Sequence, residues 1–142
     1  MGGAIQKSKV RLPVLLLSSL AIPLLSGCGR DLSTAAGTVE EFVDLHYVDM
    51  DLTKARQHCI GLALNKIDEE IRLTQGEPVD ASTRKPSVYY KLLEKRQGPA
   101  SVSFLYQGTV RPADAPVFVK RWLVTARPIK GVWKISNFAD FD

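Results

Sequence analysis

The stretch FVKRWLVTARPIKGVWKISNF, residues 118–138, predicts two β-strands joined by a tight turn at Lys130 and Gly131. The strands are expected over residues 117–127 and 132–138, which are rich in β-branched and aromatic residues. Large apolar side chains share one face of each strand: Phe118, Trp122 and Val124 on the first, Trp133 and Ile135 on the second. This hairpin is therefore expected to bury one face against other elements.

Two further strands precede this hairpin. Residues 88–94 and 101–110 show the same composition, and Gly98-Pro99 and the proline-containing stretch 111–116 separate the segments. Phe104 and Tyr106 share one face of the second segment. Four strands joined by short turns predict an antiparallel meander.

The part of the chain before residue 75 has helical periodicity. Thr38 and Glu41 fit a capping box, and apolar side chains then recur at helical spacing, namely Val39, Phe42, Val43, His46 and Met50. A second, short helix is expected from Asp51 to about Cys59, where Gly61 then interrupts. A third helix is expected to run to about Leu73, with one face formed by Ile60, Ala63, Leu64, Ile67 and Ile71. The predicted class is α+β, with three N-terminal helices packed on a four-stranded antiparallel sheet.

The closing hairpin, together with Val39-Glu40-Glu41-Phe42 and residues 51–55, resembles the nuclear transport factor two family, also called the ketosteroid-isomerase-like cone. The resemblance covers about residues 38–140 and implies a curved sheet and a cone-like domain over residues 38–142. That family includes isomerases, dehydratases, small-molecule binders and interaction modules, and many members form homodimers. Function must therefore be argued from the site.

The N-terminus has the features of a secretory leader. Lys7, Lys9 and Arg11 precede an apolar run over residues 12–25. At about 14 residues, this run is shorter than the roughly 20 that span a bilayer as a helix. The pattern predicts a signal peptide over residues 1–27.

Leu25-Ser26-Gly27-Cys28 ends this leader and resembles the bacterial lipobox. The resemblance implies cleavage between Gly27 and Cys28 and the attachment of acyl chains to Cys28. At least two chains are needed for stable anchoring in a bilayer. Residues 28–37, small and polar, are then expected to be a lipidated tether. Gly29, where Asp often retains lipoproteins at the inner membrane, implies an outer-membrane protein facing the periplasm. The alternative is an ordinary signal peptide with a chance cysteine.

Charge and cysteine content indicate which kinds of partner and which thiol chemistry the chain can have. Residues 28–142 hold 16 basic and 15 acidic side chains, so nucleic-acid binding is not expected. Residues 28–83 hold 5 basic and 11 acidic side chains, whereas residues 84–134 hold 11 and 2. A basic sheet layer fits acidic peptidoglycan, anionic lipid headgroups or an acidic partner protein, unless the two layers simply stabilise one another. With Cys28 lipidated, Cys59 is the remaining thiol, and we expect it to be structural.

His46 is the sharpest candidate for chemistry, because it falls within the apolar stripe of the first helix. A pocket in the cone would be lined by Phe42, His46, Tyr90, Phe104 and Trp122. The alternative is a core histidine bonded across the helix–sheet boundary. No CxxC, HxxxH or glycine-rich phosphate loop is present, so we expect no metal and no cofactor.

Three functions stay open at this point. We expect a non-enzymatic, membrane-anchored lipoprotein whose domain docks an envelope protein partner or a second copy of itself. The second reading is a binder of a small apolar ligand, and the third is an enzyme that uses His46.

Overall fold

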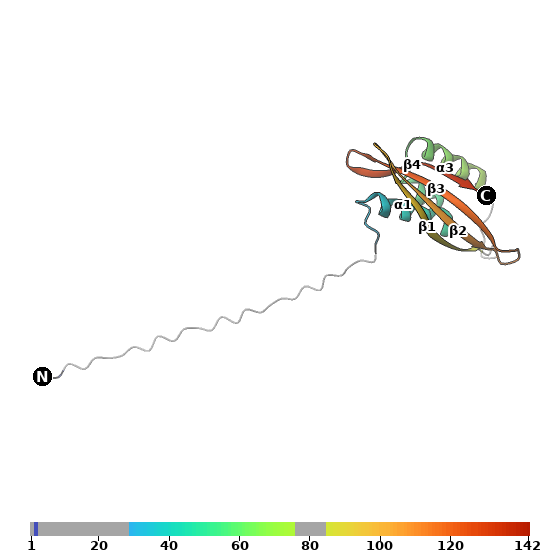
Figure 1. Ribbon diagram of the computed structural model, residues 1–142, viewed down its shortest axis with the longest axis horizontal. Coiled ribbons are helices and arrows are strands. Elements are labelled where there is room, and N and C mark those ends of the chain that lie inside the picture. The colour runs from blue at the N-terminus through green and yellow to red at the C-terminus, as the bar shows by residue number, and fades with distance from the viewer. Residues whose placement is uncertain (1, 3–28, 76–84) are drawn as a thin grey trace.

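Helical elements come first in the chain and pack on an antiparallel sheet (Figure 1). The computed structural model describes residues 2, 29–75 and 85–142. Cys28, the leader apart from Gly2, and most of the loop expected over residues 75–87 lie outside the described residues. The predicted α+β class and the four-stranded antiparallel meander are confirmed.

The helical layer contains α1 (Ala35–Val43), the π-helical turn η1 (Asp44–Val48), α2 (Leu52–Arg56) and α3 (Gly61–Thr74). η1 continues α1 directly, so the first expected helix changes its winding at Asp44. Asp51 caps α2 by accepting the Lys54 N–H at 3.1 Å, as expected. The helix α2 ends before Cys59, because residues 58–60 pair with β4: Ile135 N–H donates to His58 O at 2.8 Å, and Ile60 N–H to Ile135 O at 2.9 Å.

The start of α1 differs from the prediction. Thr34, not Thr38, is the N-cap, and its Oγ1 accepts the Gly37 N–H at 3.0 Å. Thr38 is 1% exposed inside the helix, where its hydroxyl donates to Leu32 O at 3.1 Å. The capping-box spacing was misleading because the small residues Ala35, Ala36 and Gly37 extend the helix by one turn. The domain boundary expected at residue 38 therefore moves toward the N-terminus.

The sheet contains β1 (Ser87–Gln97), β2 (Val102–Arg111), β3 (Phe118–Ile129) and β4 (Val132–Phe141), in the spatial order β1-β2-β3-β4. β1 and β4 are thus the edges. Irregularities in register lie between Leu92 and Glu94 and between Thr125 and Ala126. Bulges of this kind bend a strand and increase its twist.

The core lies between the helices and one face of the sheet. Trp122 is 2% exposed, and its ring stacks on Tyr47 at 4.1 Å between centroids. Gly108 makes room for the indole, since a Cβ at Gly108 would collide with the Trp122 ring. Phe118 shares a strand face with Trp122 by alternation, as expected, but is 42% exposed; it forms the last pair of the β2–β3 ladder, with Val110.

Candidate functional site

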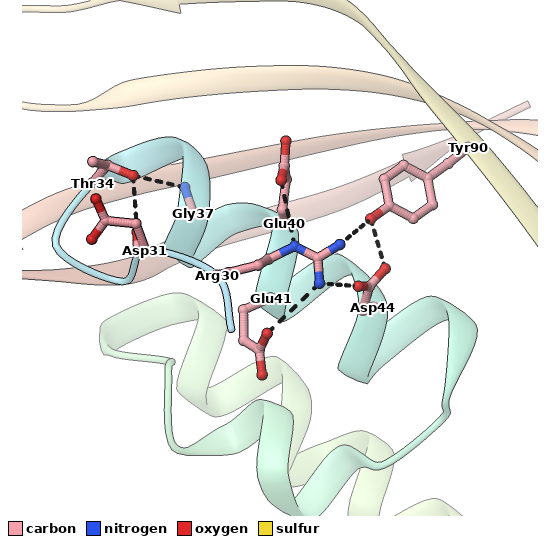
Figure 2. Close-up of polar contacts among 8 residues, drawn as sticks. All are labelled: Arg30, Asp31, Thr34, Gly37, Glu40, Glu41, Asp44 and Tyr90. Atoms are coloured by element: carbon pink, nitrogen blue, oxygen red, sulfur yellow. Dashed lines mark hydrogen bonds and ion pairs between the residues drawn. The ribbon is translucent and has the colours of Figure 1, made fainter. Parts of the chain in front are cut away.

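Arg30 lies at the centre of an ion-pair cluster that joins the first described segment to α1 and β1 (Figure 2). Its Nε lies 3.4 Å from Glu40 Oε2, its Nη1 lies 3.8 Å from Glu41 Oε2, and Nη1 also pairs with Asp44. Nη2 donates to the Tyr90 hydroxyl at 3.3 Å, and that hydroxyl donates to Asp44 Oδ1 at 2.6 Å. One side chain thereby links three regions of the sequence.

The cluster is partly shielded from solvent. The Arg30 side chain is 33% exposed and that of Asp44 is 26% exposed. Burial disfavours the charged guanidinium and is the largest single influence, but the interactions with Asp44, Tyr90 and Glu40 together outweigh it and raise the pKa of Arg30. Burial, together with the hydrogen bond to Asp44, raises the pKa of Tyr90. Tyr90 is therefore a neutral hydroxyl that relays a hydrogen bond from Arg30 to Asp44.

The backbone before α1 holds Arg30 in position. The Thr34 hydroxyl donates to Asp31 O at 3.0 Å while it caps α1 (Figure 2). The Ser33 N–H donates to Asp31 Oδ1 at 3.0 Å. Gly37 permits this close approach, because a Cβ at Gly37 would collide with Asp31 O. The tether expected over residues 28–37 is therefore corrected: the chain from Arg30 onward belongs to the folded domain.

His46 forms a pair with Glu70, a residue that the sequence analysis did not single out. His46 lies in η1, and its Nε2 is 2.6 Å from Glu70 Oε2 on α3. The His46 side chain is 8% exposed, and its Nδ1 is buried without a hydrogen-bond partner among the described residues. The bond joins two helical elements, whereas we expected one across the helix–sheet boundary. A carboxylate that orients an imidazole is one part of a general-base site.

The predicted pocket residues lie in one aromatic cluster. Phe42 is 5.2 Å from His46 between ring centroids, Tyr90 is 6.4 Å from Trp122, and Phe104 is 6.4 Å from Tyr106. Phe42, Phe104 and Trp122 are buried, whereas His46 and Tyr90 are partly exposed. Tyr47 connects the two halves of the cluster by packing on His46 and Trp122, and its hydroxyl donates to Asp140 Oδ1 at 2.7 Å. The side chains of this aromatic cluster pack together between the helices and the sheet, where the pocket was expected.

A groove of about 280 Å³ lies on the outer face of the sheet. Its lining combines apolar and charged side chains: Leu105, Leu123, Phe141, Ser103, Glu94 and Arg96. Glu94 and Arg96 form an ion pair with an Nε–Oε1 distance of 2.5 Å at its edge. The groove therefore offers a small apolar floor that faces away from the aromatic cluster.

Metal and thiol chemistry have little support in the part of the chain that the structure describes. Within residues 29–75 and 85–142, no group of three or more His, Cys, Asp or Glu side chains is placed to hold a metal ion. Cys59 is buried, and this burial raises the pKa of its thiol to about 12. The thiol is therefore protonated at neutral pH and is a weak nucleophile. No helix among the described residues is long and apolar enough to cross a membrane.

Arg30 and Glu70 are the site residues that sequence reasoning missed. Arg30 stands in a segment without periodicity, and nothing in the sequence links it to Tyr90, 60 positions later. Glu70 lies on α3, 24 positions after His46, and three neighbouring acidic residues in the sequence, Asp68, Glu69 and Glu70, are equivalent candidates. Only the packing of α3 against η1 selects Glu70.

Comparisons with known proteins identify structural similarity alone. No family model and no curated protein sequence matches the chain. A solution structure of a SEC-C motif containing protein from Rhodopseudomonas palustris is similar with a TM-score of 0.48 and 10% identity, over 80% of this chain and 83% of that one. The intermembrane space region of chloroplast protein ARC6 is similar with a TM-score of 0.41 and 14% identity, over 78% of this chain and 96% of that one. Neither similarity bears on function.

Proposed function

We propose that the chain is a membrane-anchored periplasmic lipoprotein whose domain is a non-catalytic docking or assembly module. The observation that carries the proposal is the leader: a basic start, a short apolar run, and Leu25-Ser26-Gly27-Cys28 at its end. Acyl chains on Cys28 would hold the domain at the bilayer, and Gly29 favours the outer membrane. The pattern is specific because the apolar run, the small residues and the cysteine occur in the required order.

The docking role is supported by how the interior is built. Within the aromatic cluster, where the sequence predicts a pocket, the rings of Tyr47 and Trp122 stack at 4.1 Å, and Phe42 and Phe138 lie 5.2 Å apart. The surface instead offers an acidic helical layer and a basic sheet layer. Such a charge division supports recognition of another surface, and the partner is an envelope protein or a second copy of the chain.

The finer architecture is part of the same proposal. We propose that three helices pack on a curved sheet in the cone-like arrangement of the nuclear transport factor two family. The bulges beside Leu92 and Thr125 support it, because bulges curve strands. An experimental structure with strands coiled around the helices is the expected result, and a flat sheet would contradict it.

Lipidation is tested by processing in a Gram-negative host. Globomycin should accumulate a lipidated precursor, Cys28→Ser should give an uncleaved precursor without acyl chains, and Gly29→Asp should move the protein to the inner membrane. Cleavage that is unaffected by globomycin, with the product in the aqueous phase of a detergent partition, would contradict the proposal.

An enzyme that uses His46 is the second candidate, favoured by the Glu70 carboxylate 2.6 Å from its Nε2. His46→Gln separates the two readings, because glutamine can still hydrogen-bond Glu70 but cannot act as a base. Under the docking proposal this variant keeps the cellular phenotype of the gene. A folded His46→Gln protein that has lost that phenotype would favour the enzyme.

A further inference from the structure

The strand β1 is an exposed edge that carries apolar and basic side chains together. It lies at one end of the strand order, so one side of its backbone pairs with no other strand among residues 29–75 and 85–142. Tyr89, Leu92 and Leu93 are 63%, 48% and 44% exposed. Three basic side chains lie among them, Lys91, Lys95 and Arg96, against one acidic side chain, Glu94.

The same strand is where the start of the mature chain is attached. Arg30 donates to Tyr90 on β1, and it is two residues after Cys28 in the sequence. Two residues span at most about 7 Å. From Tyr90, the exposed Leu93 is three residues farther along the strand, about 10 Å. The Arg30 and Tyr90 side chains add to this distance. If Cys28 carries lipid, we therefore expect the anchor on the side of the domain where Arg30 meets β1.

We propose that β1 is the membrane-facing edge of the domain and rests on anionic lipid headgroups. This inference depends on the proposed lipid anchor at Cys28. Leucine and tyrosine favour the membrane–water interface, and basic side chains are attracted to an anionic surface within a Debye length of about 10 Å. Arg30 has a second role here, because its charge offsets part of the negative charge of Glu40, Glu41 and Asp44 beside the anchor.

The Arg30 cluster would give the domain a defined orientation relative to the bilayer, because it holds the chain close to the lipid anchor. A tether of about ten residues would let the domain sample positions many ångströms from the bilayer. With Arg30 held by Asp44 and Tyr90, Gly29 alone separates Cys28 from the folded domain. The sheet edge then stays close to the headgroups, and β4, at the opposite edge, remains available to a partner in the periplasm.

The test measures which side of the lipidated protein touches lipid. Leu93→Cys on β1 and Leu62→Cys on α3 each replace an exposed leucine, 44% and 53% exposed, in a Cys59→Ser background. Leu62 is the matched control, because α3 packs on β4 at the opposite edge. Both proteins are labelled with an environment-sensitive fluorophore and reconstituted in phosphatidylcholine vesicles, with and without phosphatidylglycerol, that carry headgroup nitroxides. The acyl mass is measured on the same samples.

We expect several-fold stronger quenching at position 93 than at position 62, and an increase with phosphatidylglycerol. Arg30→Gln should reduce the difference between the two positions, while Arg72→Gln on α3 should not. Equal quenching at the two positions in acylated protein would overturn the orientation and leave the anchor standing. Concentration-dependent self-association that protects position 93 would also overturn it, since the edge would then pair with a second copy. Protein without acyl mass would refute the anchor itself.

Discussion

Gly37 shows how one missing side chain sets the start of the folded chain. In an ordinary helix interior, replacing glycine by alanine stabilises by about 1 kcal/mol. Here a Cβ would collide with Asp31 O, which is backbone and cannot rotate away. Gly37→Ala should therefore lower the free energy of unfolding by about 1–3 kcal/mol, measured by chemical denaturation. Gly29→Ala, with open space around its Cβ, should change nothing. Stabilisation by Gly37→Ala would contradict the packing of residues 31–34 on α1.

Arg30 is expected to contribute modestly to stability, because its partners are partly exposed. Single exposed ion pairs contribute about 0.2–1 kcal/mol, and Arg30 shares three carboxylates and a hydroxyl. Arg30→Gln should lower the free energy of unfolding by about 1 kcal/mol and should make residues 29–34 sensitive to protease. Arg72→Gln, in an exposed pair with Glu69, is the control and should cost less. Equal protease resistance of Arg30→Gln and the parent protein would show that the cluster does not hold the segment.

His58 should make the domain less stable at mildly acidic pH. Burial lowers the pKa of His58 below its ordinary value, with Glu41 and Lys134 acting in opposite directions. The unfolded chain then takes up the proton first, so stability is full above about pH 6.5, falls as the pH drops from there toward the lower folded pKa, and levels off below it. His58→Gln should reduce this loss, measured as the pH dependence of the melting temperature. An unchanged pH dependence would assign the loss to other groups.

At the scale of elements, the closing hairpin contains two tryptophans, and Trp122 is the one that is buried in the core. Trp122 is 2% exposed and stacks on Tyr47, whereas Trp133 is only partly buried. Trp122→Ala should lower the free energy of unfolding by about 3–5 kcal/mol, which is enough to unfold many domains of this size. Trp133→Ala should lower it clearly less. If urea titration ranks the two variants the other way round, β4 does not pack as described.

Elements with a strong apolar period could be predicted from the sequence, and elements set by long-range contacts could not. The four strands and the cap at Asp51 follow from alternation, turn residues and a local carboxylate. The end of α2 could not be predicted, because residues 58–60 leave the helix to pair with Ile135, far along the chain. The start of α1 was misplaced for a similar reason: Thr34 and Thr38 both suit a cap, and only the fold of residues 31–34 selects Thr34.

For the candidate sites too, features set by local periodicity could be predicted from the sequence, and features set by long-range contacts could not. The aromatic residues of the predicted pocket do gather in one cluster, since the helical and strand periods already place them on facing surfaces. The polar partners Arg30 and Glu70 were missed because charged residues outside a motif carry no periodic signal. Their roles depend on three-dimensional packing between segments 24 and 60 residues apart.

At the scale of the whole molecule, the described fold divides charge between its two layers, and the Arg30 cluster joins residues 29–34 to α1, η1 and one edge of the sheet. If Cys28 carries lipid, the orientation of the domain follows from the Arg30 cluster and not from a flexible tether. A longer tether between Cys28 and the domain should then remove this fixed orientation. Insertion of a ten-residue Gly/Ser linker between Gly29 and Arg30 should keep membrane association but remove the difference in lipid quenching between positions 93 and 62. A persistent difference would mean that β1 binds lipid without help from the anchor.

Everything proposed for the domain's position depends on Cys28 becoming the acylated first residue of a protein held at a bilayer. Intact-mass spectrometry of the protein extracted from membranes, followed by sequencing of its N-terminal peptide, tests this directly. We expect a chain that begins at Cys28 and carries the mass of at least two acyl chains. A mature chain with an unmodified Cys28, or one that begins at another residue, would contradict it.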